Sequence, residues 1–236
     1  MPSSAISPTI TVHPQLTCYL LIQIMNLTEQ WLGDNVSYEA ALQTQEDTLL
    51  EVLNGNQPDT YFTLEHAPVY TIGRTRDQSS LRDPSLLPHP TVEINRGGQA
   101  TYHGPGQLVG YPIIDLKKLG KDLHTYIRAI EHSLVLACNE EFSIPATIRD
   151  GLTGVWVENR KLCSIGVGVR KWISMHGFAM NITNESLSGF QAITPCGIAG
   201  VVMTTISKEA GTNISVREFS EKHTPYLNQT LSALET

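Results

Sequence analysis

The sequence contains few cysteines, and their spacing does not pair them. The 236 residues include four, Cys18, Cys138, Cys163 and Cys196, with no C-x-x-C pair and no Cys/His finger spacing. This pattern excludes a disulfide-stapled module and a structural zinc site. We therefore predict that the protein binds no metal and works in the reducing environment of the cytoplasm.

The sequence also lacks a charged leader and a long apolar run. Residues 1–28 contain no Asp, Glu, Lys or Arg, and Gln23 interrupts the apolar stretch 19–25. A signal peptide requires a positive segment, and a membrane-spanning helix requires about 20 apolar residues. We expect neither, and therefore no membrane partner. The Ser/Thr/Pro-rich residues 1–17 are expected to form a disordered tail, and residues 18–236 a single domain.

Positive charge is in deficit as well. Lys and Arg number 16 against 23 Asp and Glu, which gives a net charge of -7. Nucleic-acid binders need a surplus of Lys and Arg to neutralise phosphates, so this class is excluded. One stretch is an exception, because residues 159–184 contain no acid and four cations, Arg160, Lys161, Arg170 and Lys171. This stretch is either a solvated hairpin face or a docking surface for an acidic partner.

The spacing of apolar residues predicts three helices and a set of short strands. The helices cover residues 37–54, 122–140 and 215–231, the last with a break near Pro225. The strand-like runs are 60–65, 69–72, 92–94, 107–114, 154–158, 161–169, 174–182 and 201–206. Because helices and strands do not alternate regularly, we predict an α+β domain with a mixed or mainly antiparallel sheet flanked by helices.

A glycine-rich segment, Arg96–Gln107, is the most unusual part of the sequence. It reads RGGQATYHGPGQ. Its glycines allow a ligand to approach backbone N–H groups closely, but it matches neither the dinucleotide fingerprint nor the Walker loop. Arg96 is expected to hold a carboxylate, a phosphate or a structural carbonyl. His103 is either a base or a structural histidine, and the segment as a whole is either a ligand loop or a pair of turns.

Two further residues are candidates for covalent chemistry. Cys196 lies in a Pro-Cys-Gly turn, where a thiol is exposed, and it is either a nucleophile or an ordinary surface cysteine. Lys161 begins a predicted strand and shares one face of it with Cys163 and apolar residues. Its amine either reaches water at the sheet edge or is partly desolvated beside a site. Ser164 does not stand in a G-x-S-x-G sequence, which excludes the nucleophile elbow of α/β-hydrolases.

Taken together, these segments resemble the octanoyltransferase family, whose members move an octanoyl group from acyl carrier protein to a lysine of a lipoyl domain. The resemblance spans roughly residues 19–206 in family order, and the His-Gly-Pro-Gly-Gln and Pro-Cys-Gly sequences make it specific. The matching blocks are Arg96–Gln107, Gly154–Val157, Lys161 with Ser164–Gly166, His176–Ala179 with Asn181, and Ile193–Gly197, with weaker similarity over Tyr38–Gln43 and Glu65–Gly73.

The resemblance implies the fold of the catalytic domains of lipoate and biotin protein ligases. It implies that Cys196 is the acyl-accepting nucleophile and that Lys161 favours its thiolate and moves protons. The implied donor is octanoyl-acyl carrier protein, the implied acceptors are lipoyl domains of 2-oxoacid dehydrogenase E2 subunits and the glycine cleavage H protein, and no cofactor is implied. The implied substrate-binding residues are Arg96, Gly97, Gly98, Gln99, Ala100, Thr101, Tyr102, His103, Ser164, Ile165, Gly166, Gly177, Phe178 and Ala179.

Elementary chemistry agrees with this assignment. Transfer from a carrier thioester to Cys196 exchanges one thioester for another, and transfer to an amine then forms a more stable amide, so no ATP is needed. Burial of six methylenes at about 0.8 kcal/mol each supplies roughly 5 kcal/mol, and the loss of one methylene costs about fourfold in binding. Discrimination by chain length should therefore be graded unless the end of the acyl tunnel is rigid.

Two other functions stay open at this point. An ATP-dependent lipoate or biotin ligase of the same fold would not need Cys196, and a module that only binds acyl carrier protein would not turn over. Cys163 departs from the family pattern, in which we expect alanine or another small residue. It is either a buried small side chain or a second acyl acceptor.

Overall fold

A mixed sheet forms the centre of the computed structural model, which describes residues 26–74, 81, 87–193 and 201–235. Its strands follow the order β1-β2-β6-β10-β9-β8-β7, and β11 pairs with β9. The pairs β1–β2 and β9–β11 are parallel and the other pairs are antiparallel. The strands are β1 (Glu29–Trp31), β2 (Thr60–Leu64), β6 (Gln107–Ile113), β7 (Thr147–Arg149), β8 (Leu152–Val157), β9 (Arg160–Arg170), β10 (Ile173–Asn181) and β11 (Val202–Met203).

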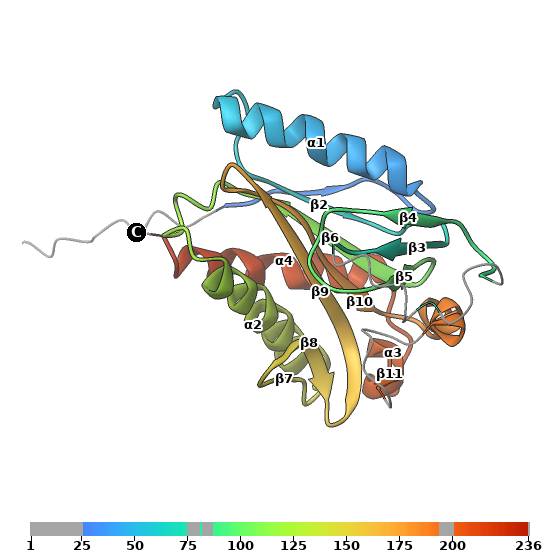
Figure 1. Ribbon diagram of the computed structural model, residues 1–236. Helices are drawn as coiled ribbons and strands as arrows, with labels where there is room; N and C mark the ends of the chain where they lie inside the picture. The colour runs from blue at the N-terminus through green and yellow to red at the C-terminus, as the bar shows by residue number, and fades with distance from the viewer. Residues whose placement is uncertain (1–25, 75–80, 82–86, 194–200, 236) are drawn as a thin grey trace, which may run out of the picture.

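A second, smaller sheet lies beside the central one (Figure 1). It has the order β4-β3-β5 and consists of β4 (Thr91–Glu93), β3 (Val69–Ile72) and β5 (Thr101–His103). The predicted α+β class with a mixed sheet is therefore confirmed. The tail predicted for residues 1–17 lies outside the described residues.

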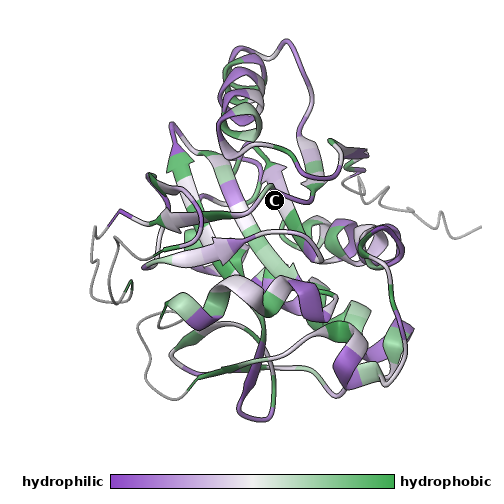
Figure 2. Ribbon diagram, turned by 90° about the vertical axis from the view of Figure 1, so that its right-hand side faces the viewer, coloured by the Kyte–Doolittle hydropathy of each residue, from purple (hydrophilic) through white to green (hydrophobic). Residues whose placement is uncertain are grey.

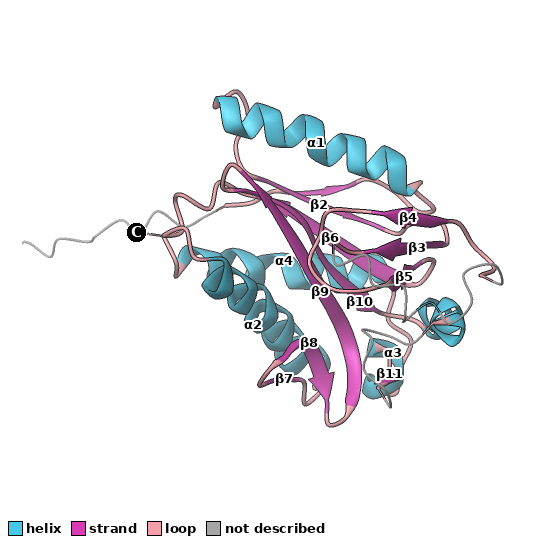
Figure 3. Cartoon of the chain, in the orientation of Figure 1, coloured by secondary structure: helices cyan, strands magenta, loops and turns pink. Residues whose placement is uncertain are grey.

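Helices cover both faces of the central sheet (Figure 3). α1 (Tyr38–Asn54) packs on one face, where its apolar side chains join residues of β2, β6 and β10 in one cluster. α2 (Leu123–Phe142) and α4 (Val216–Ser232) pack on the other face in a second cluster. Figure 2 shows that the central strands carry much of the apolar sequence. Among the described residues, no helix is both long and apolar enough to span a membrane.

Capping residues lie at the ends of α1 and α4. Ser37 Oγ accepts the N–H of Ala40 at the start of α1, and Gly55 ends that helix with a φ of 75°. Ser215 caps α4. The predicted break near Pro225 is wrong, since α4 continues through this residue. The helix survives the lost hydrogen bond because its buried face packs against α2.

The chain between β10 and α4 contains short elements. A 3-10 segment, η3 (Asn184–Ala192), follows β10. The strand predicted for residues 201–206 is shorter than expected, because β11 covers only Val202–Met203 and Ile206 begins helix α3 (Ile206–Ala210). β11 nevertheless determines the geometry of the site, since it returns the chain to the first residues of β9.

Candidate active site

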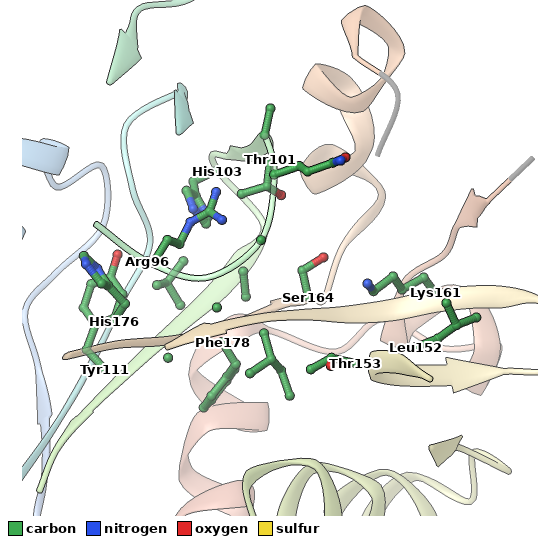
Figure 4. Close-up of a pocket in the computed structure, with 18 of the residues that line it drawn as sticks. Arg96, Thr101, His103, Tyr111, Leu152, Thr153, Lys161, Ser164, His176 and Phe178 are labelled. Carbon is green, nitrogen blue, oxygen red and sulfur yellow. The ribbon is translucent and has the colours of Figure 1, made fainter. Parts of the chain in front are cut away.

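A pocket of about 320 Å³ lies between the β9–β10 hairpin and the loop that leads into β5 (Figure 4). Of the predicted site residues that the structure describes, only Gly97 and Tyr102 do not line it. Those that do are Arg96, Gly98, Gln99, Ala100, Thr101, His103, Lys161, Ser164, Ile165, Gly166, Gly177, Phe178 and Ala179. The pocket therefore brings together the glycine-rich segment and residues of the two strands β9 and β10.

The register of the hairpin explains how the residues of the two strands meet. Ser164, Ile165 and Gly166 of β9 are the pairing partners of Ala179, Phe178 and Gly177 of β10. Gly166 is needed here because a Cβ at this position would lie 2.9 Å from Arg96 Cδ. The glycine-rich loop can thus rest on β9, where the N–H of Gly97 donates to the carbonyl of Val167 at 3.1 Å.

Arg96 is buried, and its guanidinium is used within the protein. Nη2 donates to the carbonyl oxygen and Oγ1 of Thr71 at 3.0 and 2.8 Å, and Nη1 donates to the carbonyl of Gly97 at 2.9 Å. The sequence leaves a carboxylate, a phosphate or a structural carbonyl as the partner of Arg96, and the structure shows structural carbonyls. Arg96 therefore fixes the glycine-rich loop to β3 and adds positive charge near the pocket.

His103 belongs to a buried network that links the glycine-rich loop to β10 and to the segment after β11. Its Nδ1 lies 2.8 Å from Gln107 Oε1, and Gln107 Nε2 donates to Asn181 Oδ1 at 3.0 Å. Asn181 Nδ2 then donates to the carbonyl of Thr204 at 3.2 Å. Burial lowers the pKa of His103 well below its usual value, with further lowering by His66 and Arg96. The geometry favours the structural interpretation of His103 over a base.

Two more histidines and two tyrosines lie beside His103 at one end of the pocket. His66 Nδ1 donates to the carbonyl of Val36 at 3.0 Å, so its Nε2 accepts from the hydroxyl of Tyr111 at 2.7 Å. Burial lowers the pKa of both His66 and His176 to about 4. All three imidazoles are therefore neutral near pH 7. Tyr38, Tyr111 and His176 line the pocket, although we had not predicted them as site residues.

Lys161 lies at the opposite end of the pocket from His176 (Figure 4). Its side chain is buried, and Nζ lies 5.1 Å from the centroid of the Trp156 ring. A Cβ at Gly154, which has a φ of 129°, would lie 2.8 Å from Lys161 Cε, so glycine leaves room for the lysine stem. Of the two sequence-based interpretations, the structure supports a lysine desolvated beside a site.

Cys163 and Tyr102 lie away from the pocket. Cys163 is a buried free thiol in the cluster formed with α2 and α4, and burial raises its pKa well above the usual range. This placement agrees with a small core side chain. Tyr102 packs with Tyr70 and Phe190 in a cluster around the small sheet. It therefore supports the loop from behind.

The four cations of residues 159–184 do not form one patch. Arg160 pairs with Glu158 and Glu209, at 2.6 and 2.8 Å, and Lys161 is buried. Arg170 ends β9 and Lys171 follows it, so they lie nine and ten residues, or about 30 Å, from Lys161. Of the two interpretations of this stretch, a single docking surface formed by all four cations is therefore wrong, because extended strand geometry separates them.

The predicted nucleophile, Cys196, lies outside the described residues, which end at Ile193 before it and resume at Val201. The described chain beyond it is close to Lys161. Met203 is the register partner of Lys161, and the N–H of Thr204 donates to the Lys161 carbonyl at 3.0 Å. The seven residues from Cys196 to Met203 span at most about 25 Å.

Comparison with known families gives a match over most of the chain. Residues 37–227 match the family described as lipoyl protein ligase A/B catalytic domain. The chain is 51% identical over 183 residues to the octanoyltransferase of Geobacter sulfurreducens, covering 78% of this chain and 76% of that protein. It is 46% identical over 205 residues to the octanoyltransferase of Geobacter metallireducens, covering 85% and 94%.

Solved structures agree on the fold. A lipoate-protein ligase A bound with ATP superposes with a TM-score of 0.68 at 14% identity, covering 88% of this chain and 86% of that one. The biotin protein ligase of Aquifex aeolicus in complex with biotin and ATP gives 0.58 at 14% identity, covering 88% and 72%. The fold implied by the sequence resemblance is thus confirmed. The chain belongs to the lipoyl protein ligase A/B catalytic domain family and, within it, to the octanoyltransferases.

Proposed function

We propose that this octanoyltransferase takes an octanoyl group from octanoyl-acyl carrier protein and passes it to a lysine of a lipoyl domain through a thioester on Cys196. The proposed acceptors are the lipoyl domains of 2-oxoacid dehydrogenase E2 subunits and the glycine cleavage H protein. One observation carries the proposal above the others. Lys161 is buried at one end of a pocket whose walls are the predicted substrate blocks.

The position of β11 supports the pairing of Cys196 with Lys161. Met203 lies in register with Lys161, and the N–H of Thr204 is bonded to its carbonyl. Cys196 precedes Met203 by seven residues, a separation that the chain can cover without displacing either strand. The buried network from His103 through Asn181 to the Thr204 carbonyl supports the same segment from the other side.

The proposed chemistry needs one thiolate and one amine. The ammonium of Lys161 favours ionisation of the Cys196 thiol, and the thiolate attacks the carrier thioester. The departing carrier thiolate takes the proton of the Lys161 ammonium, which releases the carrier thiol and leaves Lys161 neutral. The acceptor lysine then attacks the new thioester, which forms the amide and frees Cys196. Once neutral, Lys161 accepts the proton that the attacking ammonium must lose. The reaction consumes no ATP because the donor thioester is already activated.

Measurement of the intact mass tests this proposal. We expect the protein to gain one octanoyl group after incubation with octanoyl-acyl carrier protein, equally with and without ATP, and to lose it on addition of a lipoyl domain. The Cys196→Ser variant should gain none, whereas the matched Cys163→Ser variant should gain as much as the wild type. An adduct confined to Cys163, or no adduct, would contradict the thioester on Cys196.

The same experiment separates the two alternative functions. Transfer from free octanoate that requires ATP and survives Cys196→Ser would identify an ATP-dependent ligase. A carrier-binding module would bind octanoyl-acyl carrier protein without any mass change or turnover. Relatives at 51% and 46% identity are octanoyltransferases, whereas the ATP-bound ligase is 14% identical, which favours direct transfer.

We also place this reaction in the cytoplasm. Cys138 and Cys163 are both free thiols, as is usual in a reducing compartment. Fractionation of cells followed by detection of the protein tests this placement.

A further inference from the structure

The end of the pocket farthest from Lys161 is a wall of buried polar side chains. Tyr38, Tyr111 and His176 line the pocket there and have exposed fractions of 3%, 4% and 4%. Nδ1 of His176 is buried and has no hydrogen-bond partner among the described residues. An apolar ligand that reaches this wall therefore meets a neutral, unsatisfied ring.

His176 is held firmly in place. Its backbone N–H donates to Gln45 Oε1 of α1 at 2.8 Å. Its ring packs edge-on against Tyr111, with 6.4 Å between the centroids. Behind it, a Cβ at Gly168 would lie 3.1 Å from His176 Cδ2, so the ring already fills the space over that glycine. The φ of His176 is 56°, a backbone conformation that non-glycine residues adopt rarely and that is frequent at ligand sites.

The distance between the two ends suits an eight-carbon chain. His176 pairs with Val167 of β9, and Ser164 lies beside the ammonium of Lys161 (Figure 4). Ser164 and Val167 are three residues apart, or about 10 Å, a length that nine backbone bonds cover in an extended strand. By the same geometry, the seven carbon–carbon bonds of an extended octanoyl chain cover about 8 Å.

We propose that His176 determines acyl-chain specificity by closing the pocket at the position that the eighth carbon reaches. The proposal rests on the proposed function, which places the acyl carbonyl beside Lys161. The wall makes discrimination unequal in the two directions. A chain shorter by one methylene loses only its burial, about fourfold in binding. A longer chain must displace a packed ring or bend, and overpacking of this kind costs about tenfold or more.

The test compares kcat/KM for hexanoyl, octanoyl, decanoyl and dodecanoyl carrier proteins. For the wild type we expect hexanoyl to fall about 16-fold below octanoyl, by two methylenes, and decanoyl to fall by more than about tenfold. In His176→Gly, which accepts the positive φ and removes the ring, the decanoyl-to-octanoyl ratio should rise at least about tenfold. His176→Asn, which also tolerates positive φ, should give a smaller rise.

Met175→Ala is the matched control. Met175 is buried next to His176 in the chain but packs with α1 and does not line the pocket, so its truncation should leave the ratio unchanged. Each ratio is measured within one variant and does not depend on how much of that variant folds. A wild-type enzyme that uses decanoyl as well as octanoyl, or an unchanged ratio in His176→Gly, would overturn the proposal. Failure of all acyl donors with the wild type would instead contradict the proposed function.

Discussion

The two ends of the pocket use polar residues in opposite ways. At one end, the ammonium of Lys161 lies over Trp156 and beside the segment that follows Cys196. At the other end, His66, His103 and His176 are kept neutral by burial. The buried amine thus lies at the end where we propose that bonds change, and uncharged rings form the wall at the other end. A histidine in a pocket therefore need not be a base, since hydrogen bonding and burial decide its role.

The largest expected effect comes from removing the charge at the first end. Lys161→Ala should slow octanoyl transfer by about a thousandfold, because the variant loses both thiolate stabilisation and proton transfer. The measurement is single-turnover transfer from octanoyl-acyl carrier protein, with thermal melting to show that the fold survives. Lys171→Ala, at the distant hairpin tip, is the control. A Lys161→Ala enzyme within tenfold of the wild type would mean that Lys161 is not the acid/base group.

A smaller effect is expected from crowding Lys161. Gly154→Ala places a Cβ against Lys161 Cε and the Cys163 carbonyl at a φ of 129°, so transfer should fall by tens of fold and the free energy of unfolding by about 1–3 kcal/mol. Gly211→Ala is matched for positive φ, at 68°, but its Cβ meets nothing within 4 Å. It should cost about 1 kcal/mol and leave transfer unchanged. If both variants transfer equally well, the space at Gly154 does not position the lysine.

The histidine end predicts an effect of pH on stability. The unfolded chain binds protons at histidine near pH 6.5, whereas burial lowers the folded pKa of His66 and His176 to about 4. Stability is therefore complete above pH 6.5 and falls as pH decreases toward 4, by up to about 1.4 kcal/mol per pH unit for each histidine. Urea unfolding at pH 7, 6 and 5 measures this slope. The His66→Gln variant should show a shallower slope, and an unchanged slope would exclude His66 as a contributor.

The smallest effect is expected at the hairpin tip. Because Arg170 and Lys171 lie about 30 Å along β9 from Lys161, reversing both to Glu should change kcat/KM by less than about threefold, whether the donor is octanoyl carrier protein or a small octanoyl thioester. Steady-state kinetics with both donors check this. A loss specific to the carrier-bound donor would show that the carrier contacts the enzyme beyond the histidine end.

Much of the site could be predicted because its parts are local. The glycine-rich loop, Lys161 and the His176–Ala179 strand each stand out as short segments, and the caps at Ser37 and Ser215 follow from the sequence near them. What failed depends on pairing between distant segments. The net charge of residues 159–184 does not include the length of the strand that carries them. β9 places two of the cations at its first residues and the other two at its opposite end.

Residue roles were harder to predict than residue positions. The sequence leaves Arg96 either a ligand or a structural carbonyl as partner, and in the structure it lines the pocket while its guanidinium bonds Thr71 and Gly97. Tyr102 was an expected substrate residue and packs with the small sheet. Both lie in the motif because the loop must be held in shape, and sequence alone does not distinguish a residue that touches a ligand from one that supports it. The continuity of α4 through Pro225 likewise depends on packing against α2, which local propensity does not include.

The β9–β10 register has a consequence for redesign of this enzyme. Lys161 and His176 belong to one hairpin, so the number of strand residues between Lys161 and Val167 fixes the length of the proposed acyl site. Removal of a two-residue step from each strand preserves which side chains face the pocket, because strand faces alternate with a period of two. It would shorten the site by about 6.6 Å, close to six carbon–carbon bonds. The length of the accepted acyl chain can then be changed in discrete steps. Deletion of residues from β9 and β10, rather than substitution, would give an enzyme that transfers short acyl chains.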